Sequence, residues 1–345
     1  MHRITVGAAA LLFAALGWAQ TETGATQFGG QARLQWIGQQ ASGSGPLAQA
    51  NALQGGIVDL PVGTALLETE LRASGHGLSS VLTLQQQRSD GGASQSRAWV
   101  NELYAAHGAG AWQFSAGKKI VAWDVGYGFR PNDMIQQEQR RTLLSSTLEG
   151  RPLLMAEHFD ASTAWSWVWV NPTASNDASG AAEPALALRL YQRDGAVDWH
   201  GFARIGAHSG ASVGAAASWV ASDALELHGS LRTGAGLQKL LLGGTWTDQN
   251  QLSLLTEAWW DGSAISMLRR NLYLRLSWQH DAWQPALDML YTPADQGRIL
   301  TASLTWQGDR VQVQGGLRSY GGPANAVLMQ VPVSATAYIA GTWTF

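Results

Sequence analysis

Short segments in which apolar and polar residues alternate recur along almost the whole chain of 345 residues. In 271–279, every even position is Leu or Trp, whereas the odd positions carry Asn, Tyr, Arg, Ser and Gln. A β-strand directs successive side chains to opposite faces, so the alternation predicts strands with one apolar face. Eighteen such segments are found, at residues 28–39, 63–74, 78–88, 97–107, 111–122, 152–160, 162–171, 185–193, 197–207, 211–221, 225–234, 238–248, 251–261, 270–280, 283–291, 298–307, 310–320 and 335–345.

The connections between these segments alternate in length. Those after even-numbered segments are short and contain Gly, Asp, Ser or Asn, which are residues of tight turns. Longer connections follow the odd-numbered segments, at 40–62, 89–96, 123–151, 172–184, 262–269, 292–297 and 321–334, with short exceptions near 208–210 and 233–237. Short periplasmic turns and longer extracellular loops are typical of transmembrane barrels. The pattern predicts an antiparallel up-and-down β-barrel of about 18 strands (16–18).

The composition favours a membrane protein. Only 14% of the residues are charged, against about a quarter in soluble domains, and there are 17 Trp, which concentrate at membrane–water interfaces. After the first 19 residues no apolar run is long enough for a spanning helix, which leaves a closed barrel as the spanning structure. The formal charge of −3 gives no reason to expect a nucleic-acid partner, and the lack of Cys excludes disulfides and thiol chemistry.

The first 19 residues predict a secretory signal peptide. A basic start precedes an apolar run over 6–16, and Gly17 and Ala19 supply small residues before the expected cleavage site. The alternative, a membrane anchor, needs about 20 apolar residues, which is more than this run contains. We therefore expect export to the outer membrane of a Gram-negative bacterium, with residues 20–345 forming a single barrel domain.

The last segment, 335–345, alternates up to the final residue, Phe345. A terminal aromatic residue on such a strand resembles the assembly signal of bacterial outer-membrane barrels, carried here by Tyr338, Trp343 and Phe345. The resemblance implies the barrel-assembly machinery and outer-membrane lipid as partners. A closed barrel further predicts that this segment pairs both with 27–39 and with 310–320, which removes the last free sheet edge.

The polar side chains at alternate positions of the strands are the candidates for the pore lining. A soluble sheet, as in a secreted β-sandwich, would turn its polar face to water, whereas a membrane barrel turns it to the lumen. An isolated Arg or Lys facing lipid costs about 2–4 kcal/mol at the midplane, so the charged residues are expected inside. These residues either set solute selectivity or only stabilise the barrel by pairing. They are Arg33, Glu68, Glu70, Arg72, Arg189, Arg193, Asp198, Arg204, Glu226, Arg232, Lys239, Glu257, Arg275 and Arg318.

The longest connection, 123–151, is a candidate constriction. Loops of more than about 12–15 residues are usually functional or disordered. Asn132 and Asp133 can cap a short helix over 134–141. If the loop folds into the pore, its charged residues are expected to meet solute, and the alternative is a solvated surface loop. The candidates are Arg130, Asp133, Arg140, Arg141 and Arg151.

A family resemblance appears in the same region. Residues 117–133, followed by Gly-Arg-Pro-Leu-Leu at 150–154, resemble the "G-K/R-Q-x-V-x-W-G … N-P-x-D … P" segment of alginate-export-like porins. Asp124 stands where that family usually has Gly, and Lys119 stands where Gln is commoner. The resemblance implies a barrel that works as a specific channel, and it does not extend to alginate as the substrate.

We therefore expect an outer-membrane porin for passive diffusion of small hydrophilic solutes, without cofactor, metal or catalytic residues. A lipid-modifying barrel enzyme, the first alternative, would need a paired Ser and His. His208 and Ser209 are sequence neighbours, which a strand would point to opposite faces. The second alternative is a plugged structural or adhesion barrel. The sequence leaves the solute and the oligomeric state open.

Overall fold

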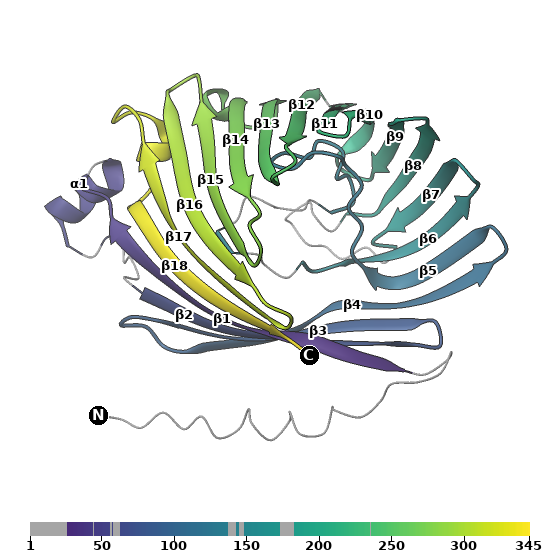
Figure 1. The fold of residues 1–345 in the computed structure, drawn as a ribbon, viewed down its shortest axis with the longest axis horizontal. Coiled ribbons are helices and arrows are strands. Elements are labelled where there is room, and N and C mark those ends of the chain that lie inside the picture. Colours follow the sequence, from purple (N-terminus) through teal and green to yellow (C-terminus); the bar gives the residue numbers. More distant parts are fainter. Residues whose placement is uncertain are drawn as a thin grey trace.

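The chain forms a single closed barrel in the computed structural model, which describes residues 26–43, 45–55, 57, 63–136, 143–144, 148–172, 183–234 and 236–345. Eighteen strands pair antiparallel in sequence order, and β18 pairs back onto β1 (Figure 1). The predicted up-and-down barrel is therefore confirmed. The strands are β1 (Gln27–Ala41), β2 (Gly63–Gly75), β3 (Leu78–Ser89), β4 (Gln95–Ala109), β5 (Trp112–Lys119), β6 (Arg151–Phe159), β7 (Thr163–Val170), β8 (Ala185–Asp194), β9 (Val197–Gly206), β10 (Gly210–Ser222), β11 (Leu225–Gly234), β12 (Leu237–Thr247), β13 (Leu252–Asp261), β14 (Arg270–Trp278), β15 (Trp283–Thr292), β16 (Gly297–Gln307), β17 (Val311–Gly321) and β18 (Val333–Thr344).

Every predicted segment coincides with a strand to within three residues at each end. The largest difference is in β5, which ends at Lys119 instead of continuing to residue 122. The chain leaves the sheet there because the amide of Ile120 donates to the carboxylate of Glu102 on β4 rather than to a neighbouring strand (2.8 Å).

The predicted alternation of connection length is also present. The connections after even-numbered strands span two to four residues, and left-handed residues such as His76, Gly77 and Asp281 close them. The opposite end carries the long connections, including α1 (Pro46–Leu53) after β1 and the short 3-10 helices η2 (Ser266–Leu268) and η3 (Val327–Met329).

The two faces of the sheet are inverted relative to a soluble protein. Large apolar side chains point outward and are exposed, among them Leu186 (61%) and Leu317 (66%). Polar side chains point inward, and Glu70 (3%) and Asn271 (7%) are buried inside the ring. An apolar exterior around a polar interior is the arrangement expected in lipid.

The last strand closes the ring as expected. Ile339 lies opposite Trp36 of β1, and Phe345 exchanges two backbone hydrogen bonds with Gly30, both of 3.0 Å. β18 also pairs with β17, so both of its edges are occupied. Trp343 faces outward and lies against Phe345, whereas Tyr338 is buried on the inner face. The role of these three residues in assembly stays a prediction.

The predicted signal peptide, 1–19, lies outside the described residues. Within the described part of the chain, no helix has the length and apolar character needed to cross a membrane.

Candidate functional site

The connection between β5 and β6 spans residues 120–150, and its described residues enter the barrel (Figure 1). Both of its ends are attached to β4. Asn101 is the extra residue of a β-bulge, where the pairing with β3 shifts by one residue. The buried side-chain amide of Asn101 donates to the backbone carbonyl of Leu148 (2.8 Å). The backbone carbonyl of Asn101 accepts from the backbone amide of Gly150 (2.8 Å). With Ile120 bound to Glu102, the loop leaves and rejoins the sheet at one place.

The loop folds around an internal ion pair. The carboxylate of Asp133 accepts from the amides of Trp123 (2.9 Å) and Asp124 (3.1 Å) and forms a salt bridge with Arg130 (2.8 Å). Arg130 and Asp133 are both buried and pair with each other inside the loop. From the sequence, both side chains were instead expected to meet solute. Residues 134–136 are not helical, so Asn132 and Asp133 cap no helix there; residues 137–141 of the predicted helix, with Arg140 and Arg141, lie outside the described residues.

Two polar side chains of the loop bind β11 on the far wall. The Ser230 hydroxyl donates to Asp124 (2.7 Å), and the fully buried amide of Asn132 donates to the Ser230 hydroxyl and to the Leu231 carbonyl, both at 2.9 Å. Burial raises the pKa of Asp124 above its ordinary value, against the opposing effect of hydrogen bonds from the Asn132 amide and Ser230. Asp124, which replaces the usual Gly of the resembling segment, thus fastens the loop to the wall.

A second attachment is made by Glu257 on β13. Its carboxylate accepts from the amides of Tyr127 and Gly128, both at 2.6 Å, and lies 3.0 Å from Nε2 of His228. The Glu257 side chain is completely buried. Gly243 makes room for it, since a Cβ there would lie 2.5 Å from His228 Nε2 and 2.7 Å from Glu257 Cγ. Hydrogen bonds to a buried carboxylate are strong, so this contact fixes the loop firmly.

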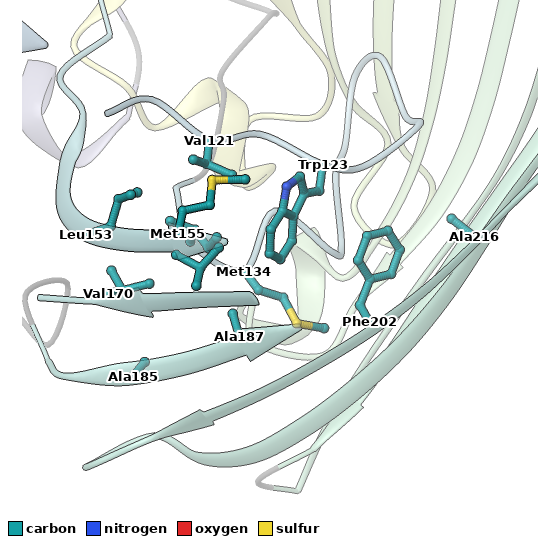
Figure 2. Packing of buried hydrophobic residues seen from close by; sticks show 12 residues of the cluster. Val121, Trp123, Met134, Leu153, Met155, Val170, Ala185, Ala187, Phe202 and Ala216 are labelled. Carbon is teal, nitrogen blue, oxygen red and sulfur yellow. The ribbon is translucent and has the colours of Figure 1, made fainter. Parts of the chain in front are cut away.

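Apolar side chains fill the space between the loop and the wall. Figure 2 shows Trp123 and Met134 of the loop over Met155 and Phe202 of β6 and β9. The rings of Trp123 and Phe202 are 6.4 Å apart, and a second cluster stacks Phe129 on Trp259 at 5.6 Å. Burial of a large apolar side chain is worth about 1.5–3 kcal/mol, so the loop has its own core inside the barrel.

The predicted lumen residues mostly pair with neighbours on the wall. The salt bridges are Arg33–Glu68 (3.0 Å), Arg72–Glu70 (2.5 Å), Arg204–Glu183 (2.6 Å), Lys239–Asp261 (3.4 Å) and Arg275–Asp288 (2.9 Å). The pairs Arg33–Glu68, Lys239–Asp261 and Arg275–Asp288 join adjacent strands, and such cross-strand pairs stabilise a sheet.

The remaining candidates differ in their surroundings. Arg232 donates to Ser212 and to the loop at Pro131, Glu226 accepts from Ser218, and Arg318 donates to Thr301. The guanidinium of Arg189 lies 3.3 Å from Nδ1 of His200. Near the β8–β9 turn, Nε of Arg193 is 4.0 Å from the carboxylate of Asp198. Arg151 is the first residue of β6, and it is partly buried.

A polar cluster that the sequence pattern did not predict lies at the rim above β8–β10. The buried carboxylate of Glu183 accepts from Arg204 (2.6 Å), from the amides of His208 (2.6 Å) and Ser209 (2.9 Å), and from the Ser209 hydroxyl. Burial disfavours the charged form, but the hydrogen bonds from Ser209, Arg204 and His208 outweigh it and lower the pKa of Glu183 to about 2.

On the side of β1–β4 the lumen is not filled by the described loop residues. A cavity of about 630 Å³ lies there between the wall and the loop ends at Ile120 and Leu148. Most of the residues that line it are polar, among them Arg33, Glu70 and Arg72. The interior is thus asymmetric, with a packed loop on one side and polar space on the other.

Comparisons with known proteins agree on the fold. No family model and no curated protein sequence matches the chain. Among solved structures, it is similar to variants of the porin of Rhodopseudomonas blastica, with 13% identity, a TM-score of 0.54 and coverage of 93% of this chain and 100% of the other. It is also similar to Pseudomonas aeruginosa OccK5 (OpdH), with 8% identity, a TM-score of 0.61 and coverage of 93% and 98%. The chain shares the closed-barrel fold of these porins.

Proposed function

We propose that this protein is an outer-membrane porin through which small hydrophilic solutes diffuse passively. One observation carries the proposal: the closed barrel has an apolar outside and a polar inside, with polar space left beside an internal loop. A barrel of this strand number is wide enough for an aqueous channel. The similarity in fold to bacterial porins supports the same conclusion.

The internal loop would set the width of the channel. Its described residues pack against β6–β15, so solute would pass on the side of β1–β4, where the larger cavity lies. Arg72 and Arg193 have exposed side chains near the short turns. They would meet solute at the end of the barrel that carries these turns. Transport of this kind follows the concentration gradient and needs no covalent chemistry.

His208 and Ser209, the best candidate pair for a catalytic site, do not support the alternative of a barrel enzyme. Ser209 bonds to Glu183 and Arg204, which leaves His208 contributing only its backbone amide to the same cluster. A nucleophile activated by a base needs a direct Ser–His contact, and these side chains are not arranged in that way.

Targeting and insertion complete the proposal. Residues 1–19 would direct export, and the terminal strand with Phe345 would be recognised by the barrel-assembly machinery. A chain ending at Thr344 is expected to insert poorly while full-length protein inserts. Normal insertion of the shortened chain would contradict this part.

The transport function is tested by liposome swelling. Vesicles that contain the purified protein are expected to swell in solutions of small sugars, at rates that fall with sugar size. Vesicles that never swell faster than protein-free vesicles would contradict the porin function and favour a plugged barrel.

A further inference from the structure

The outward-facing positions of the described strands carry few charged residues, and the basic ones share a location. Lys or Arg occupies four of these positions, namely Arg88 of β3, Lys118 of β5, Arg270 of β14 and Arg298 of β16. Each is the first or second residue from the strand end that adjoins a long connection. Asp194, the acidic residue at an outward position of β8, lies at the opposite end, beside a short turn. The basic groups of the outer surface are therefore confined to one rim of the barrel.

Two of these arginines lie on the outer rim of β13–β16, four strands that stand side by side (Figure 1). Arg270 lies opposite Trp260 of β13, and its guanidinium is 5.3 Å from the centre of the Trp260 ring. Arg298 lies opposite Tyr291 of β15. Its side chain lies beside Gly321 of β17, where a Cβ would be 2.8 Å from the Arg298 Nε.

Neither arginine pairs with an acidic side chain of the described residues, and both are exposed. The acids of the adjoining connections are engaged elsewhere. Asp261 pairs with Lys239 on the inner face (3.4 Å), and Asp295 accepts from the Thr292 hydroxyl (2.6 Å) and from the amides of Gly297 (3.0 Å) and Val327 (2.8 Å).

Lys118 differs from the two arginines, because it pairs with Glu149 (2.5 Å). The rim of β13–β16 thus presents two cations to the membrane without anions of its own.

An unpaired guanidinium is unfavourable beside hydrocarbon, and it is tolerated where it can reach the headgroups of the lipid. Neighbouring strands are about 4.8 Å apart, so the strands of Arg270 and Arg298, separated by β15, are about 10 Å apart. Each guanidinium offers paired N–H donors that match the oxygens of a phosphate. The two arginines therefore suit a phosphate-bearing headgroup that lies between them.

The surroundings of the arginines suit an amphiphile rather than a free ion. Two residues further into their strands, Leu272 and Leu300 are exposed on the lipid-facing surface, and Ile265 and Met267 are exposed in the connection before β14. Such side chains favour contact with acyl chains. Trp260 and Tyr291 add aromatic rings with a polar end, which suit a sugar ring beside the phosphate. The long connections of such a barrel face the outside of the cell, so the lipid would belong to the outer leaflet.

We propose that the outer rim of β13–β16, with Arg270, Tyr291 and Arg298, binds the phosphate of a phosphorylated glycolipid in the outer leaflet. The inference rests on the outer-membrane location in the proposed function, and it adds a lipid site on the outside of the barrel. The arginines hold the phosphate, and the acyl chains lie along Leu272 and Leu300.

Lipid binding to the full-length protein in neutral detergent tests the site. Native mass spectrometry counts the bound molecules over a concentration series of lipid A, which is a diphosphorylated glycolipid. Wild-type protein is expected to bind lipid A in a saturable way and to bind its dephosphorylated form at least tenfold more weakly. The double variant Arg270→Gln/Arg298→Gln should raise the half-saturating concentration of lipid A about tenfold or more, because two charged hydrogen-bond donors are lost.

A matched pair of single variants controls for the loss of charge. Arg298→Gln should weaken the binding of lipid A several-fold. Arg310→Gln removes an exposed arginine from the β16–β17 turn at the other end of the barrel, and it should bind lipid A like the wild type. If the double variant fails to fold, the comparison of phosphorylated and dephosphorylated lipid on the wild-type protein still decides the site.

The outcomes separate this site from the porin function. Equal affinity of the wild type for both forms of lipid A, or unchanged affinity in the double variant, would overturn the site. Equal affinity for phosphatidylglycerol would overturn the assignment to a glycolipid. Absence of conductance in bilayers of phospholipid alone would overturn the porin function and would leave the binding result standing.

Discussion

Asp124, Asn132 and Glu257 are the side chains that fix the internal loop to the opposite wall. Each one is buried, so it must find partners for its polar atoms inside the barrel, and β11 and β13 supply them. The loop position thus depends on a few polar contacts in addition to its apolar core.

Replacement of Glu257 by Gln should loosen the loop. The neutral amide oxygen binds the Tyr127 and Gly128 amides more weakly, and its NH₂ group would face one of them, at a cost of about 1–3 kcal/mol. Single-channel recordings are expected to show added current fluctuation. Glu226→Gln, a change on the partly exposed neighbour of His228, is the matched control, and quiet recordings from both variants would contradict the clamp.

Replacement of Gly214 by Ala should displace the loop by steric contact. A Cβ at Gly214 would lie 1.8 Å from the Asn132 amide oxygen, which cannot be relieved without moving the loop or β10. Lower thermal stability and a larger conductance are expected. Gly201→Ala on β9 meets only Leu190 at 3.9 Å and should behave like the wild type. Identical melting and conductance in both variants would show that the loop does not approach β10 this closely.

The rim cluster around Glu183 should give acid sensitivity. The folded-state pKa of about 2 lies below the ordinary value of 4.5, so its stabilising effect is complete above the ordinary value. It is lost as the pH falls toward about 2, because the proton binds the unfolded chain more tightly. The protection of the His208 and Ser209 amides against hydrogen exchange, measured relative to their intrinsic exchange rates, should fall over that range in the wild type. Glu183→Gln should show no such step, and a step in both proteins would place the titration elsewhere.

At the scale of elements, the strands and turns were predictable because most strands repeat their alternation over enough residues to outweigh local propensity. The end of β5 was not predictable. The amide of Ile120 leaves the sheet and donates to the carboxylate of Glu102, and no local sequence pattern indicates this contact. Hydrogen bonds between the loop and β11 or β13 join residues about a hundred positions apart or more, as in Ser230–Asp124 and Tyr127–Glu257.

One signal for the loop was present in the sequence. Several inward positions of β6–β8 are apolar like the outward positions, with Leu153, Met155, Val168, Val170 and Ala187 all buried. A water-filled lumen does not need apolar wall residues, so a segment apolar on both faces indicates that something covers it. The candidate pore residues were placed on the correct strands, but their pairing partners could not be predicted, because register sets them.

At the scale of the whole molecule, the barrel has three distinct regions. The outer surface is apolar, the β6–β15 side of the interior is packed by the described part of the loop, and a cavity lined mostly by polar residues lies beside β1–β4. Closure of β18 on β1 makes this arrangement possible in lipid, since each of the described strands is paired along both edges. The proposed channel function follows from the combination of these regions.

Single-channel conductance in planar bilayers tests the central claim most directly. Wild-type protein is expected to give discrete steps of uniform size, and the double variant Asp124→Ala/Asn132→Ala, which lacks the side chains that bind β11, is expected to give larger steps. Wild-type protein that inserts into the bilayer and conducts no ions would contradict the claim that the barrel holds an open pore beside its loop.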